Sequence, residues 1–175
     1  MMSKGVTLLE LMVVLVIISV MAAIALPDLR VFASRRTLGR QGDELVAILN
    51  RSREMAMEQG ITWRVLFSPE EQRCISFGDK NADSQIDPGE EQIGPFYLSE
   101  GISYGSLAPS GPNKTTIPSD GVSFTSNRTS FSYMGCCNAG TVYLKSEDRS
   151  LAIRLMPSSG MVRMWEYDMS WQVVK

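Results

Sequence analysis

The sequence predicts an α+β fold in which a long N-terminal α-helix packs on an antiparallel β-sheet head. The first observation is an apolar tract over residues 6–27 that contains one charged residue. The second is the recurrence of apolar residues at spacings near three and four over residues 31–59, which is typical of an amphipathic helix. The third is a change at Ile61 to short strand-like runs separated by turn residues. The 175 residues suit one modest domain with an appendage, and we expect residues 61–175 to form the head.

The apolar tract has the length and composition of a membrane-spanning helix. The run from Leu11 to Leu26 is interrupted only by Ser19, and the preceding residues Val6 to Leu9 make it long enough to cross a bilayer. We therefore predict that residues 6–27 form the membrane-spanning half of the N-terminal helix.

A secretory signal peptide is the alternative interpretation of this tract. Lys4, the apolar core and the small residues near its end resemble the three regions of such a peptide. Two features argue against removal: Glu10 lies within the apolar core, and the helical pattern continues without a break after Pro27. We therefore expect a retained stem.

The basic residues beside the tract oppose export of the C-terminal part. Lys4 is the basic residue that precedes the tract, whereas four arginines follow it, and positive charge normally keeps a flank in the cytoplasm. An exported head therefore requires a dedicated export and processing pathway. The arginines are Arg30, Arg35, Arg36 and Arg40.

Glu10 requires a partner or a purpose, because a charge at the centre of a bilayer costs roughly 2.5–3.5 kcal/mol on insertion scales. A chance acidic residue near a helix N-terminus is one explanation, since the helix dipole favours it by roughly 0.3–1 kcal/mol. The surrounding residues offer a more specific one. The stretch Lys4-Gly5-Val6-Thr7-Leu8-Leu9-Glu10 resembles the class III signal of type IV prepilins and pseudopilins.

This resemblance implies processing and assembly. Residues 1–5 would be a leader peptide, a membrane prepilin peptidase would cleave between Gly5 and Val6, and the new N-terminus at Val6 would be methylated. In a filament the carboxylate of Glu10 can pair with the amine of a neighbouring subunit's Val6. Such a pair offsets part of the desolvation cost and sets the axial register between subunits.

Residues 28–60 are predicted to form the periplasmic, amphipathic half of the same helix, with Gly60 as its C-cap. Gly39 and Gly42 weaken the middle of this half. At Pro27 the resemblance implies a kink in the stem, and the alternative is that the helix ends there. The stripe expected to lie on the sheet comprises Leu38, Leu45, Ile48, Leu49, Ser52, Ala56 and Met57.

The head is predicted to consist of short strands and turns. Ser-Pro-Glu-Glu-Gln at 68–72 is typical of a hairpin connection between the first two strands. The tract between Gly105 and Gly121 is rich in Gly, Pro, Ser and Asn and is interpreted as an exposed loop. The expected strands are 62–67, 73–77, 92–98, 122–125, 130–134, 141–145, 152–156 and 162–167.

Motifs of the head narrow the resemblance. They are Ile75-Ser-Phe-Gly-Asp-Lys-Asn-Ala-Asp, Asp87-Pro-Gly-Glu-Glu, Val122-Ser-Phe, Gly140-Thr-Val-Tyr-Leu, Ile153-Arg-Leu and Ser159-Gly-Met-Val-Arg. Together they resemble the H-type minor pseudopilins of type II secretion and the FimT-like minor pilins. The resemblance implies a non-enzymatic minor subunit that initiates or caps a filament for protein export, anchored by a single pass in the inner membrane with its head in the periplasm. Its partners would be other pilin or pseudopilin subunits and the prepilin peptidase.

A FimT-like minor type IV pilin, acting in pilus assembly or DNA uptake, is the alternative function. DNA binding needs a basic surface, but the formal net charge is −2 and one tail arginine typical of FimT-like members is replaced by Met161. A membrane-anchored enzyme is a third class. The chain has no histidine, and no nucleophile, base and orienting group converge in the sequence of the head. Arginines available to DNA are Arg128, Arg149, Arg154 and Arg163.

An acidic segment of the head has the spacing of a twelve-residue EF-hand loop, which makes calcium the one candidate cofactor. Ser84 in place of the turn glycine, Pro88, and strand-like flanks depart from that loop. The alternative is a polar hairpin loop stabilised by Asp and Asn turns. The candidate ligands are Asp79, Asn81, Asp83, Gln85, Asp87 and Glu90.

Three cysteines make an odd count. If the head is exported, we expect one disulfide between Cys74 and either Cys136 or Cys137, which leaves one thiol over. Three cysteines without histidine lack the usual zinc ligand set.

Overall fold

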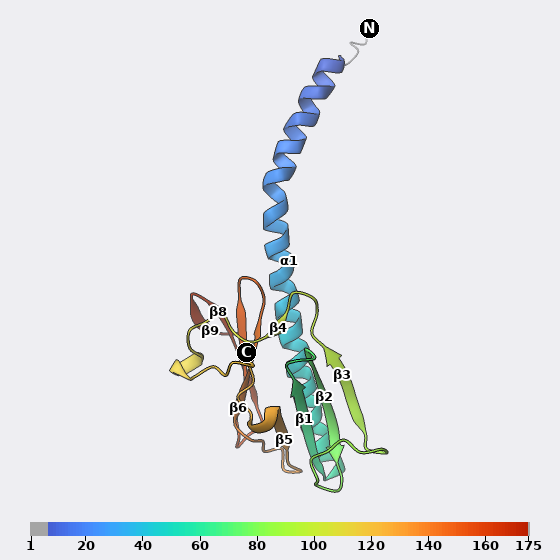
Figure 1. The fold of residues 1–175 in the computed structure, drawn as a ribbon. Helices are drawn as coiled ribbons and strands as arrows, with labels where there is room; N and C mark the ends of the chain where they lie inside the picture. Colours follow the sequence, from blue (N-terminus) through green and yellow to red (C-terminus); the bar gives the residue numbers. More distant parts are fainter. Residues whose placement is uncertain (1–6, 175) are drawn as a thin grey trace.

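The computed structural model describes residues 7–174, with the side chains of residues 23–34 left out of the description. A long helix leads into a head of two antiparallel sheets, and this architecture confirms the predicted α+β class (Figure 1). The elements are α1 (Leu8–Gln59), β1 (Thr62–Ser68), β2 (Arg73–Asp79), β3 (Gln92–Tyr97), β4 (Ser103–Tyr104), β5 (Arg128–Phe131), β6 (Gly140–Lys145), β7 (Ser150–Leu155), β8 (Val162–Asp168) and β9 (Ser170–Val173), with short 3-10 turns at Pro112–Lys114 and Thr125–Asn127.

The helix α1 begins and ends at capped positions. The hydroxyl of Thr7 accepts a hydrogen bond from the backbone N–H of Glu10 (3.2 Å). At the other end Gly60 adopts a left-handed conformation (φ 68°) and its N–H donates to the carbonyl of Ala56, which confirms the predicted C-cap. The helix continues through Pro27, so the interpretation that it ends there is wrong.

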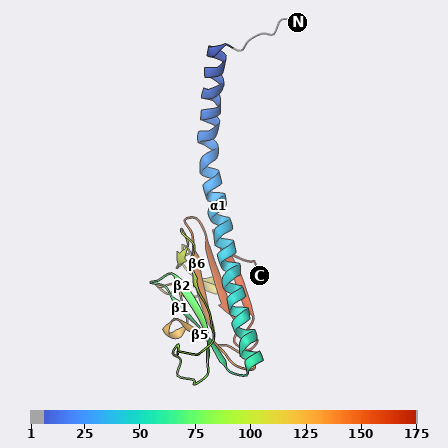
Figure 2. The same ribbon diagram turned by 90° about the vertical axis from the view of Figure 1, so that its right-hand side faces the viewer.

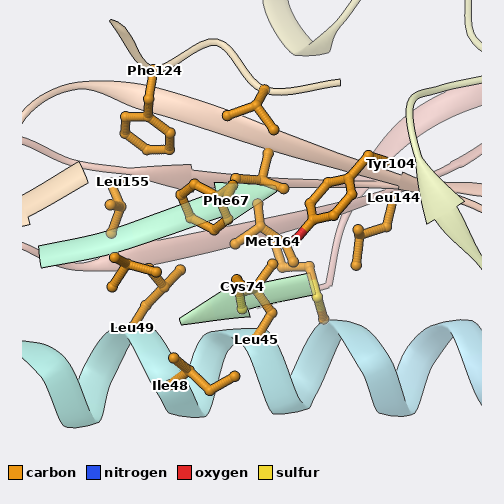
Figure 3. Close-up of a cluster of buried hydrophobic side chains, with 14 of the residues drawn as sticks. Leu45, Ile48, Leu49, Phe67, Cys74, Tyr104, Phe124, Leu144, Leu155 and Met164 are labelled. Atoms are coloured by element: carbon orange, nitrogen blue, oxygen red, sulfur yellow. The ribbon is translucent and has the colours of Figure 1, made fainter. Parts of the chain in front are cut away.

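The C-terminal half of α1 lies along one side of the head, and the N-terminal half extends beyond it (Figure 2). Residues of α1 that contact the sheets recur every three or four positions because one face of a helix has that period. Both sheets contribute to the core beneath this face (Figure 3). The buried side chains that meet there include Leu45, Ile48 and Leu49 of α1, with Phe67, Cys74, Tyr104, Phe124, Leu144, Leu155 and Met164 of the head.

The head contains two sheets where the sequence predicted one. Their strand orders are β3-β2-β1-β5 and β4-β6-β7-β8-β9, and all pairs are antiparallel. The predicted hairpin is confirmed, since β1 pairs with β2 from Thr62 opposite Asp79 to Ser68 opposite Arg73. In β1 the buried side chains alternate with half-buried ones, as expected for a strand that lays one face on a core.

The predicted strand at 122–125 is wrong. Val122 makes an isolated bridge to Val142, and Thr125 already begins a 3-10 turn. Ser126 and Asn127 have positive φ angles, so the chain turns sharply there and β5 begins at Arg128, earlier than predicted. Strands β4 and β9 were not predicted: the first has two residues, and the second follows β8 after the one-residue turn at Met169.

The segment 105–121 is not simply an exposed loop, which corrects the sequence prediction. Gly111 packs where an added Cβ would meet the hydroxyl of Tyr143, and Ala108 is buried. The side chain of Ile117 contacts a small cluster formed around Tyr143 and Trp165 on the outer face of the second sheet. The segment is therefore held by tertiary contacts that its Gly- and Ser-rich composition did not indicate.

Candidate functional site

The N-terminal part of α1 presents apolar side chains that the head does not cover. The large hydrophobic residues from Leu8 to Met21 are 47% to 77% exposed. Glu10 lies at the start of this surface and is itself exposed. No ion pair involving Glu10 occurs among the described residues. A carboxylate thus stands next to an apolar helix surface with no partner in the described part of its own chain.

The local sequence explains why the helix starts beside this carboxylate. Thr7 and Glu10 are three residues apart, the spacing of a helix N-cap followed by an acidic residue in the first turn. The sequence prediction does not include Thr7 as a cap, and the Thr-x-x-Glu spacing is the signal that indicates it. The carboxylate of Glu10 also lies at the positive end of the helix dipole.

The predicted processing site falls outside the described residues, because it involves Gly5 and Val6. The predicted membrane-spanning range 6–27 likewise includes side chains that are not described. Within the described part of the chain, no helix has an apolar stretch sufficient to cross a membrane.

The acidic segment forms the connection between β2 and β3, at the end of the head farthest from the N-terminus (Figure 1). Three of its predicted ligands meet: the side-chain amide nitrogen of Asn81 donates to Asp83 (3.0 Å) and to Asp87 (2.8 Å). The backbone N–H of Gln85 donates to Asp83 (2.7 Å), so the chain curls around this point.

Asp79 differs from the other acids of the segment because it is buried. Its side chain has 0% exposure and pairs through Oδ2 with the Arg64 guanidinium of β1. The same Oδ2 accepts the backbone N–H of Ser84 (3.2 Å) from the opposite side of the segment. The other oxygen, Oδ1, is buried without a hydrogen-bond partner. No spacing rule links Arg64 to Asp79, so this ion pair was not predictable from the sequence.

Glu90 closes the segment. Its two carboxylate oxygens accept the backbone N–H groups of Lys80 (2.9 Å) and Asp87 (3.2 Å), near the beginning and the end of the turn. The next residue, Glu91, accepts a hydrogen bond from Gln59 at the last position of α1 (2.6 Å). The predicted ligand Gln85 contributes its backbone to the curl, and the structure assigns no contact to its side chain.

In this conformation, no three His, Cys, Asp or Glu side chains among the described residues lie close enough together to hold a metal ion. The amide of Asn81 instead lies between two carboxylates. The hydrogen-bonded turns are those of the polar hairpin loop considered as the alternative.

The predicted disulfide is wrong, since the three cysteines are free. Cys74 lies opposite Phe67, near the end of β1. Cys137 bridges Phe131, which lies opposite Trp63 at the start of β1. Four residues along a strand span about 13 Å, far beyond the Cα separation that a disulfide allows. The adjacent Cys136 lies in the same turn and is equally remote.

The thiols of the two regions have different surroundings. Burial raises the pKa of the Cys74 thiol to about 12, so it is a neutral group of the core at neutral pH. Partial burial raises the pKa of Cys137 to about 11. Cys136 and Cys137 donate to the carbonyls of Ser158 and Met156, respectively.

The four arginines considered for DNA binding interact with other groups of the protein. Arg149 pairs with Glu166 and Asp168, which cancel its charge locally. Arg128 donates to the carbonyl of Ser84 (2.7 Å). Arg154 and Arg163 lie over the ring of Trp165, and Arg154 also donates to Thr141 (3.0 Å). This arrangement does not favour a nucleic-acid surface.

Comparison with known proteins confirms the type of N-terminus. Residues 1–26 match the prokaryotic N-terminal methylation motif, the signal that the prepilin resemblance implied. No curated protein sequence matches the chain.

Among solved structures, two of the minor pseudopilin EpsH from the type 2 secretion system of Vibrio cholerae are similar. One shares 15% identity, covers 73% of this chain and 94% of that chain, and has a TM-score of 0.47. The other shares 13% identity, covers 74% and 93%, and has a TM-score of 0.45.

Proposed function

We propose that the chain is a minor pseudopilin, a structural subunit that initiates or caps the pseudopilus of type II secretion. Residues 6–27 would anchor it in the inner membrane with its head in the periplasm. After cleavage between Gly5 and Val6 the helix would pass from the membrane into the filament. Other pilin-like subunits would then surround it.

The observation that carries the proposal is Glu10, which has no ion-pair partner among the residues that the structure describes and lies beside an uncovered apolar helix surface. Apolar side chains from Leu8 to Met21 need lipid or other helices to cover them, because the head lies at the far end of α1 (Figure 2). The methylation motif at residues 1–26 supports the same assignment.

The pairing of Glu10 with a neighbour's N-terminus explains how one carboxylate can direct assembly. In an apolar environment an unpaired carboxylate is costly, whereas a charged pair recovers much of that cost. A subunit displaced along the filament would leave the carboxylate unpaired. The pair therefore selects one axial register.

The experiment is complementation of a strain that lacks this gene, with the normally secreted proteins measured in the medium and in the periplasm. The wild-type gene should restore secretion. Glu10→Gln, which keeps size and removes charge, should leave the secreted proteins in the periplasm although the leader is still cleaved. Glu58→Gln, an exposed glutamate at the other end of α1, is the matched control and should behave as the wild type.

Unchanged secretion in the strain without the gene would contradict the type II assignment. Counting surface pili and measuring DNA uptake in that strain would then test the FimT-like type IV pilin alternative. Normal secretion by the Glu10→Gln variant would contradict the assembly role of this carboxylate.

A further inference from the structure

We propose that the connection between β2 and β3, residues 79–90, binds a calcium ion. This site is separate from the apolar helix surface between Leu8 and Met21, and it does not depend on the filament function. The segment carries four carboxylates within twelve residues, at positions 79, 83, 87 and 90. Clustered carboxylates alone do not define a cation site, and Asp79 adds a buried carboxylate oxygen that has no hydrogen-bond partner.

Asp79 has a buried oxygen that the protein does not satisfy. Its Oδ2 is fully used by Arg64 and by the N–H of Ser84, but Oδ1 has no partner although the side chain is 0% exposed. Leaving a charged oxygen buried and unpaired is costly. The carboxylate accepts the N–H of Ser84 from within the connection and therefore borders the turn, so a cation held by the turn would provide the missing partner of Oδ1.

Two further candidate ligands, Asp83 and Asp87, meet at the side-chain amide of Asn81. Asn81 donates to both Asp83 and Asp87, so the partial positive charge of its nitrogen lies between two carboxylates. Rotation of this exposed amide by half a turn would give up the hydrogen bond from the backbone N–H of Asp83 to Oδ1 (3.1 Å) and would place Oδ1 where the nitrogen now lies. The three side chains would then offer oxygen atoms only, which is the ligand type that calcium requires.

Glu90 supplies the last carboxylate of the set. It lies at the twelfth position counted from Asp79, where a bidentate glutamate completes a calcium loop. At present its oxygens accept the N–H groups of Lys80 and Asp87, which already draws it across the turn. Calcium suits this connection better than magnesium, because calcium accepts irregular sets of six to eight oxygens.

Arg64 limits how strongly the site can bind. Its guanidinium lies against Asp79, so a cation at Oδ1 would be close to a positive charge. Four carboxylates exceed that single charge, and Arg64 also fixes the orientation of the Asp79 carboxylate. We expect an affinity in the range of extracellular calcium modules, about 0.1–1 mM.

The test uses the full-length chain in detergent micelles after treatment with a chelator. Calcium chloride is titrated by calorimetry, and the melting temperature is recorded with and without calcium. Terbium provides a second signal, because Trp63 packs against Gly78, next to Asp79, and can sensitise its luminescence. Calcium should raise the melting temperature, since it binds the folded state.

The decisive variant is the double substitution Asp83→Asn with Asp87→Asn. It should bind calcium about tenfold more weakly or worse, because affinity follows the number of charged ligands. Glu70→Gln with Glu100→Gln removes the same charge from two exposed positions elsewhere in the head and should bind as the wild type. Asn81→Ala, at an exposed position, should also lose affinity and provides a second variant if the first fails to fold.

The proposal is overturned if about 10 mM calcium, well above the dissociation constants of such modules, gives neither heat nor a change in melting temperature. Equal affinity in the double variant and the wild type would overturn it too. Equal loss of calcium affinity in the two double variants would also overturn it, because calcium would then respond to the net charge of the head and not to this connection.

Discussion

The hydroxyl oxygens of Ser52 and Ser76 lie 2.6 Å apart where α1 crosses β2, and both residues are fully buried. Ser52 also donates to the carbonyl of Ile48 (2.7 Å), so its only proton is used. Ser76 must therefore donate to Ser52. This bond joins the helix to the first sheet at one fixed register within an otherwise apolar interface.

Removing the hydroxyl of Ser52 should lower the free energy of unfolding more than removing the hydroxyl of Ser76. Ser52→Ala leaves the hydroxyl of Ser76 as a buried donor without an acceptor, which should lower the free energy of unfolding by about 1–3 kcal/mol. Ser76→Ala leaves Ser52 bonded to Ile48 and should cost less. Urea unfolding of the full chain in micelles measures both. The double variant should lose less free energy of unfolding than the two single variants lose together. Strictly additive losses would show that the hydroxyls do not interact.

Two glycines of α1 should respond differently to alanine. Gly39 has open space around an added Cβ, so Gly39→Ala should raise the free energy of unfolding by about 0.5–1 kcal/mol through helix propensity. At Gly42 the Cβ would lie 2.6 Å from Cδ1 of Leu151 and 3.0 Å from the sulfur of Met164. Gly42→Ala should therefore be about 1–3 kcal/mol less stable than Gly39→Ala. Equal melting temperatures for the two variants would contradict the close approach at Gly42.

Asp148 should make stability depend on acid pH. Partial burial acts to raise the pKa of Asp148, but hydrogen bonds from Arg35 (2.9 Å) and Ser146 (3.1 Å) outweigh it and hold the pKa below its ordinary value. A lowered pKa means that the fold favours the charged carboxylate. The resulting stability is present above about pH 4 and is lost as the pH falls through the lowered pKa.

This dependence can be measured with one substitution. Asp148→Asn should melt at a lower temperature than the wild type at pH 6, and the difference should disappear at strongly acid pH. The neighbouring exposed Glu147 has no ion pair within the described residues, and Glu147→Gln should melt as the wild type at both pH values. A difference between Asp148→Asn and the wild type that persists in acid would point to a cause other than the carboxylate charge.

The cysteines should behave as separate thiols. Cys74 is 4% exposed and its thiol has a pKa raised to about 12 by burial, so alkylation of the native protein at pH 8 should leave it unmodified. Unfolding in urea should make it reactive. Mass spectrometry of non-reduced peptides should show no link from Cys74 to Cys136 or Cys137, and detection of such a link in the folded protein would contradict the distance between the two regions.

Local sequence patterns predicted the helix and strands correctly where the apolar positions of the pattern are the positions buried in the structure. The three-to-four spacing of apolar residues and Gly60 located the end of α1, and Ser-Pro-Glu-Glu-Gln at 68–72 located the first hairpin. The strand prediction at 122–125 was wrong because positive φ angles at Ser126 and Asn127 turn the chain, and such angles carry little signal in residues other than glycine. The disulfide prediction was wrong because cysteine counts say nothing about distance.

The sequence by itself determined the prepilin-type N-terminus, the long helix and the α+β class, because each depends on residues that are close together in the chain. Helix periodicity, caps and signal motifs are local properties of that kind. Tertiary structure alone decided that the strands divide into two sheets, that Arg64 reaches Asp79, and that Cys74 lies far from Cys136 and Cys137. These relationships join residues distant in sequence, and they are set by how the helix and sheets share one core and by which buried polar atoms find a partner.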